Sequence, residues 1–283
     1  MAYSLSIVVD NNVPIGAGKP FLGEHGLAML LETDDVRLLL DTGQSGTAVI
    51  NNLSLLGVPP ATLSAIVLSH GHYDHCGGLA QLLAHAGTRL PVHVHAEAFA
   101  PRYSLSGETR RFVGIPHRRE YLESLGADWR TASLPEEILP RVWVSGSVPR
   151  RTAFETGDTR LVTVPDGDGA CACQDALADD MALYLSTDAG LVVLAGCAHA
   201  GMLNMIAHGL EVTGCSRLAG WVGGTHLGPV SEAQQAASIE ALLALQPDFV
   251  AASHCTGFAM LARLQAAFGE RFKPAFVGTR FSF

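Results

Sequence analysis

The sequence lacks the surplus of basic residues that a nucleic-acid-coating surface requires. Its 283 residues include 18 Lys and Arg against 27 Asp and Glu, which gives a formal net charge of −9 at pH 7 with His counted as neutral. Such a balance argues against general binding to the phosphate backbone of DNA or RNA. We therefore expect no nucleic-acid partner.

Long hydrophobic runs are also absent. The apolar run at 191–195 is far shorter than the roughly 20 residues of a membrane-spanning helix, and Asp188 lies just before it. The first residues include no basic segment and reach Asp10 early, so they do not resemble a signal peptide. We expect a cytoplasmic protein that has no membrane partner.

Charged residues are scarce at 16%, whereas hydrophobic residues make up 48% of the chain. This composition supplies enough apolar material for a substantial core and too little charge for a disordered chain. No low-complexity linker or short-period repeat divides the sequence, so we expect a single domain over 1–283. The six Cys in a chain of this length favour free thiols or site residues over a disulfide framework.

Short runs rich in Val, Ile and Leu occur from end to end and alternate with helical patterns. Runs without polar alternation are typical of strands covered on both faces, so we predict a layered α/β fold with sheets inside and helices outside. The predicted strands are 5–9, 28–31, 36–40, 65–68, 92–94, 142–144, 161–164, 182–185, 191–194, 218–222 and 249–251. The predicted helices are 77–86, 199–212, 231–245 with Ser231 as its N-cap, and 258–268.

The stretch 97–160 has many Pro and Gly and less regular periodicity, which predicts an insertion or lid over a site. Ten of the 18 basic residues lie within 102–160, and all ten are Arg. Eight acids accompany them, so this part has a net charge of +2 and the remainder −11. Arg suits bidentate binding of carboxylate or phosphate, so we expect Arg150 or Arg151 to bind an anionic small molecule. The alternative is a solvated, salt-bridged segment.

The strongest signal is a turn with four ligand-type residues within six positions, after the predicted strand 65–68 and before a helix. These residues are His70, His72, Asp74 and His75. Imidazole nitrogen and carboxylate oxygen together suit Zn²⁺, Fe or Mn. We expect Gly71 to remove side-chain bulk between the first two imidazoles. One short turn cannot surround two ions, so further ligands must come from elsewhere in the chain.

This turn resembles the signature of the metallo-β-lactamase-fold superfamily, whose fold is an αββα sandwich. The resemblance covers nearly the whole chain. It implies that His70 and His72 bind a first metal ion. It also implies a second ion bound by Asp74, His75 and His254.

The middle of the chain departs from the superfamily pattern. Cys197 stands where a bridging Asp is expected and is either a soft metal ligand or a small buried residue. We predict that His199, two residues further on, is a ligand. The usual preceding His has no counterpart, and Asp179 or Asp180 in that region reaches the metal, orients a ligand or caps a helix. Asp41 matches an early Asp that supports a ligand His.

Seven strings resemble the dihydropteroate-synthase-like branch of this superfamily. They are Glu24-His25-Gly26-Leu27, the turn from Ser69 to His75, Gly146-Ser147-Val148-Pro149-Arg150, Phe154-Glu155, Gly196-Cys197-Ala198-His199-Ala200-Gly201, Gly223-Gly224-Thr225-His226-Leu227 and His254-Cys255-Thr256-Gly257. This branch includes archaeal synthases that join a dihydropterin methyl group to ribofuranosylaminobenzene phosphate. Most of its members are described only as metal-dependent hydrolases.

We expect a metal-dependent hydrolase that uses two divalent ions, with Zn as the first expectation and Fe or Mn as alternatives. A metal-bound hydroxide would attack a small anionic phosphoester, ester or lactone. Asp74 and His226 are the expected catalytic residues, with His226 in substrate contact or proton transfer. His25 is expected to line the cleft, although each of these two His has a plain structural alternative.

Two other functions fit the same residues. One is a pterin-type transferase that joins a dihydropterin methyl diphosphate to an arylamine. The other is a non-catalytic metal-binding or redox protein, and the pair Cys171 and Cys173 is a further candidate for an extra metal or redox group.

Overall fold

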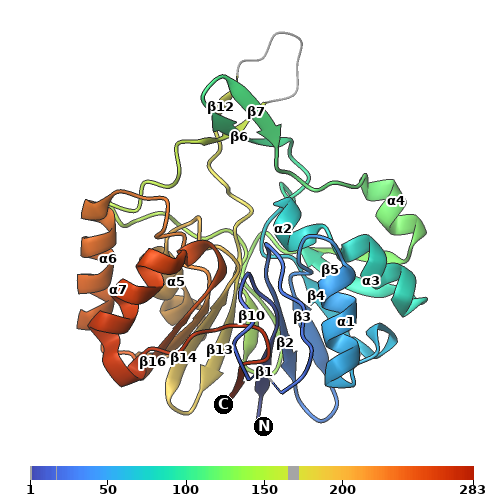
Figure 1. Cartoon of the computed structure of the whole chain (residues 1–283), viewed down its shortest axis with the longest axis horizontal. Coiled ribbons are helices and arrows are strands. Elements are labelled where there is room, and N and C mark those ends of the chain that lie inside the picture. Colours follow the sequence, from blue (N-terminus) through green and yellow to red (C-terminus); the bar gives the residue numbers. More distant parts are fainter. Residues whose placement is uncertain (1, 17, 165–171) are drawn as a thin grey trace.

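The computed structural model describes residues 2–16, 18–164 and 172–283. Two large sheets face each other at the centre of the molecule (Figure 1). The first sheet contains, in spatial order, β17 (Arg280–Ser282), β1 (Ser4–Val9), β2 (Ala28–Glu32), β3 (Arg37–Leu40), β4 (Ala65–Val67), β5 (Leu90–Val94) and β8 (Ala127–Thr131). From β17 to β3 neighbouring strands are antiparallel, and from β3 to β8 they are parallel.

The second sheet begins with three parallel strands and ends with antiparallel ones. It contains, in spatial order, β16 (Phe249–Ala252), β15 (Leu218–Gly223), β14 (Gly190–Ala195), β13 (Ala182–Thr187), β10 (Val142–Val144) and β9 (Glu136–Leu139). Because β14, β15 and β16 are parallel neighbours, their carboxyl ends meet at one edge of this sheet.

Helices cover the outer face of each sheet (Figure 1). The first sheet is covered by α1 (Thr47–Leu56), α3 (Leu79–Ala86) and α4 (Arg119–Ser124), whose apolar side chains share one core cluster with it. The second is covered by α5 (Met202–Thr213), α6 (Glu232–Ala244) and α7 (Phe258–Phe268). A separate apolar cluster joins the two inner faces, with Ile7, Leu40, Val192 and Val222 among its members. The predicted αββα sandwich is therefore confirmed.

A small third sheet projects beyond the sandwich (Figure 1). It contains β12 (Cys173–Gln174), β11 (Leu161–Thr163), β6 (Arg102–Ser106) and β7 (Thr109–Phe112). The stretch 97–160, predicted as an insertion or lid, is divided among the sheets: β6 and β7 lie in the small one, whereas β8, β9 and β10 belong to the large ones. The strand predicted at 142–144 agrees with β10, whereas the proline and glycine content of this stretch concealed the other four.

The element predictions hold best where a segment is buried. Helix 258–268 agrees with α7, and Ser231 caps α6 by accepting a hydrogen bond from the backbone N–H of Gln234. The helix predicted over 199–212 begins later, at Met202, because Gly201 has a φ of 102°. The missed strands are β6, β7, β8, β9, β12 and β17, whose exposed or half-exposed positions leave no continuous apolar run. Among the described residues, no helix has the length and apolarity needed to cross a membrane.

Candidate metal centre

The His-rich turn begins where β4 ends, and its side chains are withdrawn from solvent. Asp74 and His75 lie in the short helix α2 (Tyr73–Cys76), and His70 and His72 lie on the turn before it. All four side chains are buried, although burying ionisable groups costs free energy unless they find partners. These four side chains therefore need either a bound ligand or hydrogen-bond and ion-pair partners within the protein.

Gly71 is required for a reason other than the predicted one. A Cβ atom at this position would lie 1.9 Å from the carbonyl oxygen of Ala98 and 2.6 Å from Nη1 of Arg102. We expected a glycine here in order to keep two imidazoles free of side-chain bulk, and this is not the main reason for it. Its lack of a side chain lets the turn pack against the chain entering β6, and its N–H donates to Oδ2 of Asp179 at 2.7 Å.

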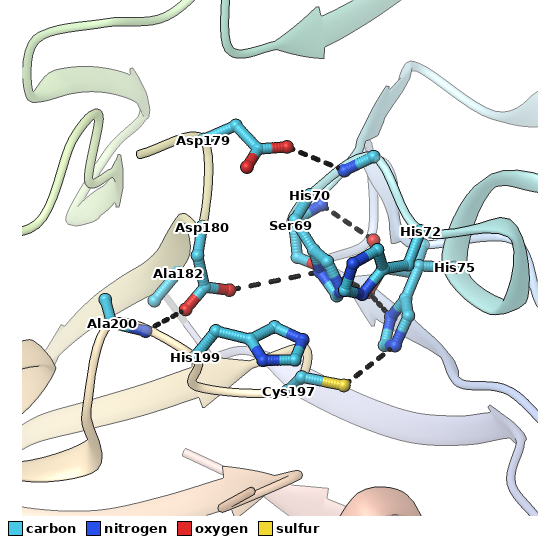
Figure 2. A network of polar contacts seen from close by, with 12 residues as sticks. Ser69, His70, His72, His75, Asp179, Asp180, Ala182, Cys197, His199 and Ala200 are labelled. Atoms are coloured by element: carbon cyan, nitrogen blue, oxygen red, sulfur yellow. Dashed lines mark hydrogen bonds and ion pairs between the residues drawn. The ribbon is translucent and has the colours of Figure 1, made fainter. Parts of the chain in front are cut away.

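Three imidazoles gather around one point (Figure 2). Nε2 of His70 lies 2.9 Å from Nδ1 of His72, and the ring of His199 lies 4.8 Å from the first and 4.9 Å from the second, centre to centre. His199 follows β14 in the second sheet, whereas the other two follow β4 in the first. The structure thus brings the predicted ligand His199 to the first pair across the interface between the sheets.

A second group of donors lies beside the first. Nε2 of His75 is 3.1 Å from Sγ of Cys197 and 3.1 Å from Nε2 of His254. Oδ2 of Asp74 is 3.3 Å from Nε2 of His254 and 3.2 Å from Nε2 of His25, which is half exposed. Cys197 also groups with His70 and His199, so its thiol lies between the two sets of donors.

Asp41 holds the orientation of His75. Its Oδ2 lies 2.6 Å from Nδ1 of His75 and accepts the hydroxyl of Ser69 at 2.7 Å, while its Oδ1 accepts the Ser69 N–H at 2.7 Å. With Nδ1 occupied in this way, Nε2 of His75 faces Cys197 and His254. A carboxylate behind a ligand imidazole fixes its tautomer and its direction.

Asp179 and Asp180 are both buried but have different partners. Asp179 accepts from Gly71 and from Nη2 of Arg102, so it holds the turn in place. Asp180 accepts the N–H of Ala200 at 2.6 Å through Oδ2, while its Oδ1 lies 3.9 Å from Nδ1 of His70 (Figure 2). No helix begins at either residue, so the alternative of a helix cap is wrong.

The donor set fits a metal ion. Within the described ranges, Nε2 of His72, both ring nitrogens of His199 and Oδ1 of Asp180 are buried and have no hydrogen-bond partner. Burial lowers the pKa of His72 to about 3 and holds the pKa of His70 and His199 well below the ordinary value, so these rings are neutral. Neutral imidazole, thiol and carboxylate donors are those that Zn²⁺ and related ions bind.

The predicted substrate arginines have structural contacts. Arg150 donates to the backbone carbonyls of His199 at 2.8 Å and of Ala176. Arg151 pairs with Glu211 on α5. These contacts hold the loop of His199 and the outer helix, so anion binding by either arginine stays a prediction.

His226 lies beside the centre, 4.1 Å from His199 between ring centres. Burial lowers the pKa of His226, but Asp158 and Cys255 outweigh this effect and raise it to about 9.

Two residues near the centre were not predicted as site residues. The sequence analysis noted Cys255 only as a neighbour of His254 and did not single out Arg102. The position of Cys255 after a ligand His was the available signal. Cys171 lies outside the described residues, and its companion Cys173 is exposed in β12.

Two facing sheets that hold buried imidazoles, a thiol and carboxylates at one common edge define an αββα protein with a candidate metal centre. The family described as the metallo-beta-lactamase superfamily matches residues 23–254, and the chain belongs to that superfamily. The resemblance inferred from the motifs is therefore confirmed.

The relatives that match nearly the whole chain include a synthase, an uncharacterized protein and a structure described as a hydrolase. The chain is 26% identical over 271 residues to the 7,8-dihydropterin-6-methyl-4-(beta-D-ribofuranosyl)-aminobenzene-5'-phosphate synthase of Methanocaldococcus jannaschii, covering 92% of this chain and 89% of the synthase. It is 32% identical to an uncharacterized protein of the same organism, over 92% and 93% of the two chains. A solved structure described as a metal-dependent hydrolase of the beta-lactamase superfamily has a TM-score of 0.82 and 25% identity, covering 99% of this chain and 98% of its own.

Proposed function

We propose that the protein is a metal-dependent hydrolase of a small anionic substrate. The observation that carries this proposal is a buried group of neutral imidazoles in which Nε2 of His72 and both ring nitrogens of His199 have no hydrogen-bond partner among the described residues. Unpartnered polar atoms in a buried position are costly unless a ligand completes them. The full-length similarity to a metal-dependent hydrolase structure supports the same reading.

The donors divide between two ion positions. His70, His72 and His199 would hold one ion, and Asp74, His75 and His254 would hold the other, with Cys197 between them. Divalent ions bound here would polarise a substrate oxygen and activate water for attack. We favour Zn²⁺ because the set combines imidazole, thiol and carboxylate, although Fe and Mn also bind imidazole and carboxylate.

The chain's own residues prepare these positions. Burial raises the pKa of Asp74, but His75, His25 and His254 outweigh it and hold the pKa well below the ordinary value. Asp74 is therefore ionised and supplies a negative charge to the second ion position. Asp74 also raises the pKa of His25 against the effect of burial. A half-exposed imidazole with a raised pKa is suited to receive the anionic group of a substrate at the open side.

A pterin-type transferase is the second candidate. The similarity to the archaeal synthase extends over 92% of this chain, which favours a reaction of that type. In such a reaction the ions held by the same residues would bind the diphosphate leaving group while an arylamine attacks the dihydropterin methyl carbon. The fold by itself does not separate the two reactions, because one fold supports many chemistries.

One assay series distinguishes the candidates. Purified protein is stripped with a chelator, reloaded separately with Zn²⁺, Fe²⁺ or Mn²⁺, and offered phosphodiesters, esters, lactones, and a dihydropterin methyl diphosphate with and without an arylamine. We expect metal-dependent hydrolysis that needs no amine. A product formed only with the amine would establish the transferase instead.

The matched variants are His70→Ala in the centre and His85→Ala, whose side chain is exposed on α3. We expect the first to lose metal and activity and the second to retain both. A protein that binds no metal after metal-replete expression contradicts both candidate reactions.

A further inference from the structure

A third group of donors, the thiol cluster, consists of Cys197, His226 and Cys255. One donor atom from each residue lies within 4.8 Å of the other two. The three residues follow β14, β15 and β16, which are parallel neighbours. Three separate strand ends therefore deliver two thiols and one imidazole to the same point, and this placement depends on the sheet and not on proximity in sequence.

The backbone makes room for this cluster. A Cβ atom at Gly224 would lie 2.6 Å from Sγ of Cys255 and 2.4 Å from the carbonyl oxygen of Gly196. The absence of a side chain at Gly224 thus allows the thiol to reach its position. His226 has a φ of 46°, and His254, next to Cys255, has a φ of 52°. Non-glycine residues in this conformation are strained and cluster at functional sites.

His226 has the surroundings of a metal-ligating histidine. Its two ring nitrogens are buried and have no hydrogen-bond partner in the part of the chain that the structure describes. Oδ2 of Asp158 lies 3.6 Å from Nε2 of His226, and Arg160 holds the same oxygen at 2.6 Å. A carboxylate beside the ring is the usual support of a ligand imidazole.

The chemistry of these donors selects a thiophilic ion. Sulfur ligands favour Zn²⁺ over Mg²⁺, Ca²⁺ or Mn²⁺, and two cysteines with one histidine leave a fourth tetrahedral position open. Two deprotonated thiols would also balance the charge of one divalent ion. The thiol of Cys197 also lies 3.1 Å from Nε2 of His75, so Cys197 belongs both to this cluster and to the main centre.

We propose that Cys197, His226 and Cys255 bind a thiophilic divalent ion in addition to the two ions of the histidine centre. Here His226 is a ligand and not a proton carrier. The site goes beyond the proposed function and shares only Cys197 with it. The function therefore does not depend on this additional ion.

Cobalt reconstitution tests the site directly. Chelator-treated protein is loaded with Co²⁺, the bound metal is counted by mass spectrometry, and the thiolate-to-cobalt absorption is recorded. We expect Cys255→Ser and His226→Ala each to bind one equivalent fewer than the wild type, and Cys255→Ser to lose part of the sulfur absorption. Cys215→Ser is the matched control, because this half-buried thiol lies near Ser186, and it should leave both readings unchanged.

Alkylation of the wild-type protein tests the site without relying on variants, which could fail to fold. Iodoacetamide labelling is followed by peptide mass spectrometry during Co²⁺ titration, and Cys255 should become protected as the last equivalent binds. Unchanged metal count and absorption in Cys255→Ser, with no protection of Cys255 in the wild type, would overturn the thiol cluster as a site. That result leaves the proposed function intact, because loss of metal in His70→Ala tests the function separately.

Discussion

Several residues at the centre have strained backbone conformations. Asp41, Ala198, His226 and His254 have φ values between 46° and 63°, although none is a glycine. Such a conformation costs roughly 1–3 kcal/mol for each residue. Hydrogen bonds hold two of them in place: Asp41 bonds to Ser69, and the N–H of His254 donates to Asp10 at 2.8 Å. The folded chain therefore holds the donors in position by its own contacts.

At the same scale, Asp41→Asn should weaken metal binding. The amide cannot replace both carboxylate oxygens toward His75 and Ser69, so the imidazole loses its fixed direction. Loss of such support costs about 10- to 100-fold in metal affinity. Competition titration with a chromophoric chelator measures the change.

Asp34→Asn is the control for this variant, because Asp34 is exposed on a loop after β2. Its metal affinity should equal that of the wild type. Unaltered affinity in Asp41→Asn would show that His75 is held without Asp41.

At the scale of elements, α5 is anchored at its start from outside the helix. The N-cap Gly201 has no side chain, and the buried carboxylate of Glu155 instead accepts the N–H groups of Leu203 and Asn204 at 2.9 and 3.0 Å. Oδ1 of Asn204 in turn accepts the N–H of Arg151 at 2.8 Å. This anchoring also fixes the preceding loop, which includes His199, a residue of the centre.

Further along α5, His208 should make stability depend on pH. Burial lowers its pKa below 6.5, and its Nδ1 lies 3.1 Å from the hydroxyl of Tyr184. The unfolded chain therefore binds a proton more readily than the folded protein, and the contribution of His208 is lost as the pH falls below 6.5. Urea unfolding across this range should show the gap between wild type and His208→Gln narrowing toward acid.

The matched control is His85→Gln, since His85 is exposed on α3. Its difference from wild type should stay constant over the same range. A gap for His208→Gln that is independent of pH would mean that His208 has the same pKa in both states.

At the scale of the whole molecule, one buried arginine connects the projecting small sheet to the metal-binding turn. Arg102, the first residue of β6, is 2% exposed at its side chain. It pairs with Asp175 and Asp179 at 2.8 Å each, and Asp179 also accepts from the N–H of Gly71. Through Asp179, Arg102 therefore links the first residue of the small sheet to the His-rich turn.

Arg102→Met should destabilise the protein strongly. It removes the donors while keeping an extended side chain, and it leaves two buried carboxylates without their cation. Removing one partner of a buried pair costs about 3–5 kcal/mol. Chemical denaturation measures this loss, and chelator competition should show weaker metal binding as well.

Arg130→Met is the comparison, because Arg130 forms an exposed pair with Asp128 and exposed pairs contribute about 1 kcal/mol or less. Equal losses of stability in the two variants would contradict the claim that the buried ion pairs of Arg102 stabilise the fold more than an exposed pair does.

The sequence predicted those elements and residues that are buried or whose spacing along the chain is short. Buried apolar strands and α7 were predicted because their pattern is local, whereas β8 and β9 were missed because only one of their nine residues is buried. Gly71 was singled out for the wrong main reason, since its neighbour Ala98 is distant along the chain. Arg102 was one of ten arginines in its segment, and no local feature distinguishes it from the others.

The sequence by itself determined the class of fold and the presence of a turn rich in metal-ligand residue types, because strand hydrophobicity and the spacing of His70, His72, Asp74 and His75 are local properties. Only the tertiary structure decided how Cys197, His226 and Cys255 meet. These residues follow three different strands, and the parallel pairing of those strands brings their ends together at one edge. Contacts of this kind arise from sheet order, which linear spacing does not encode.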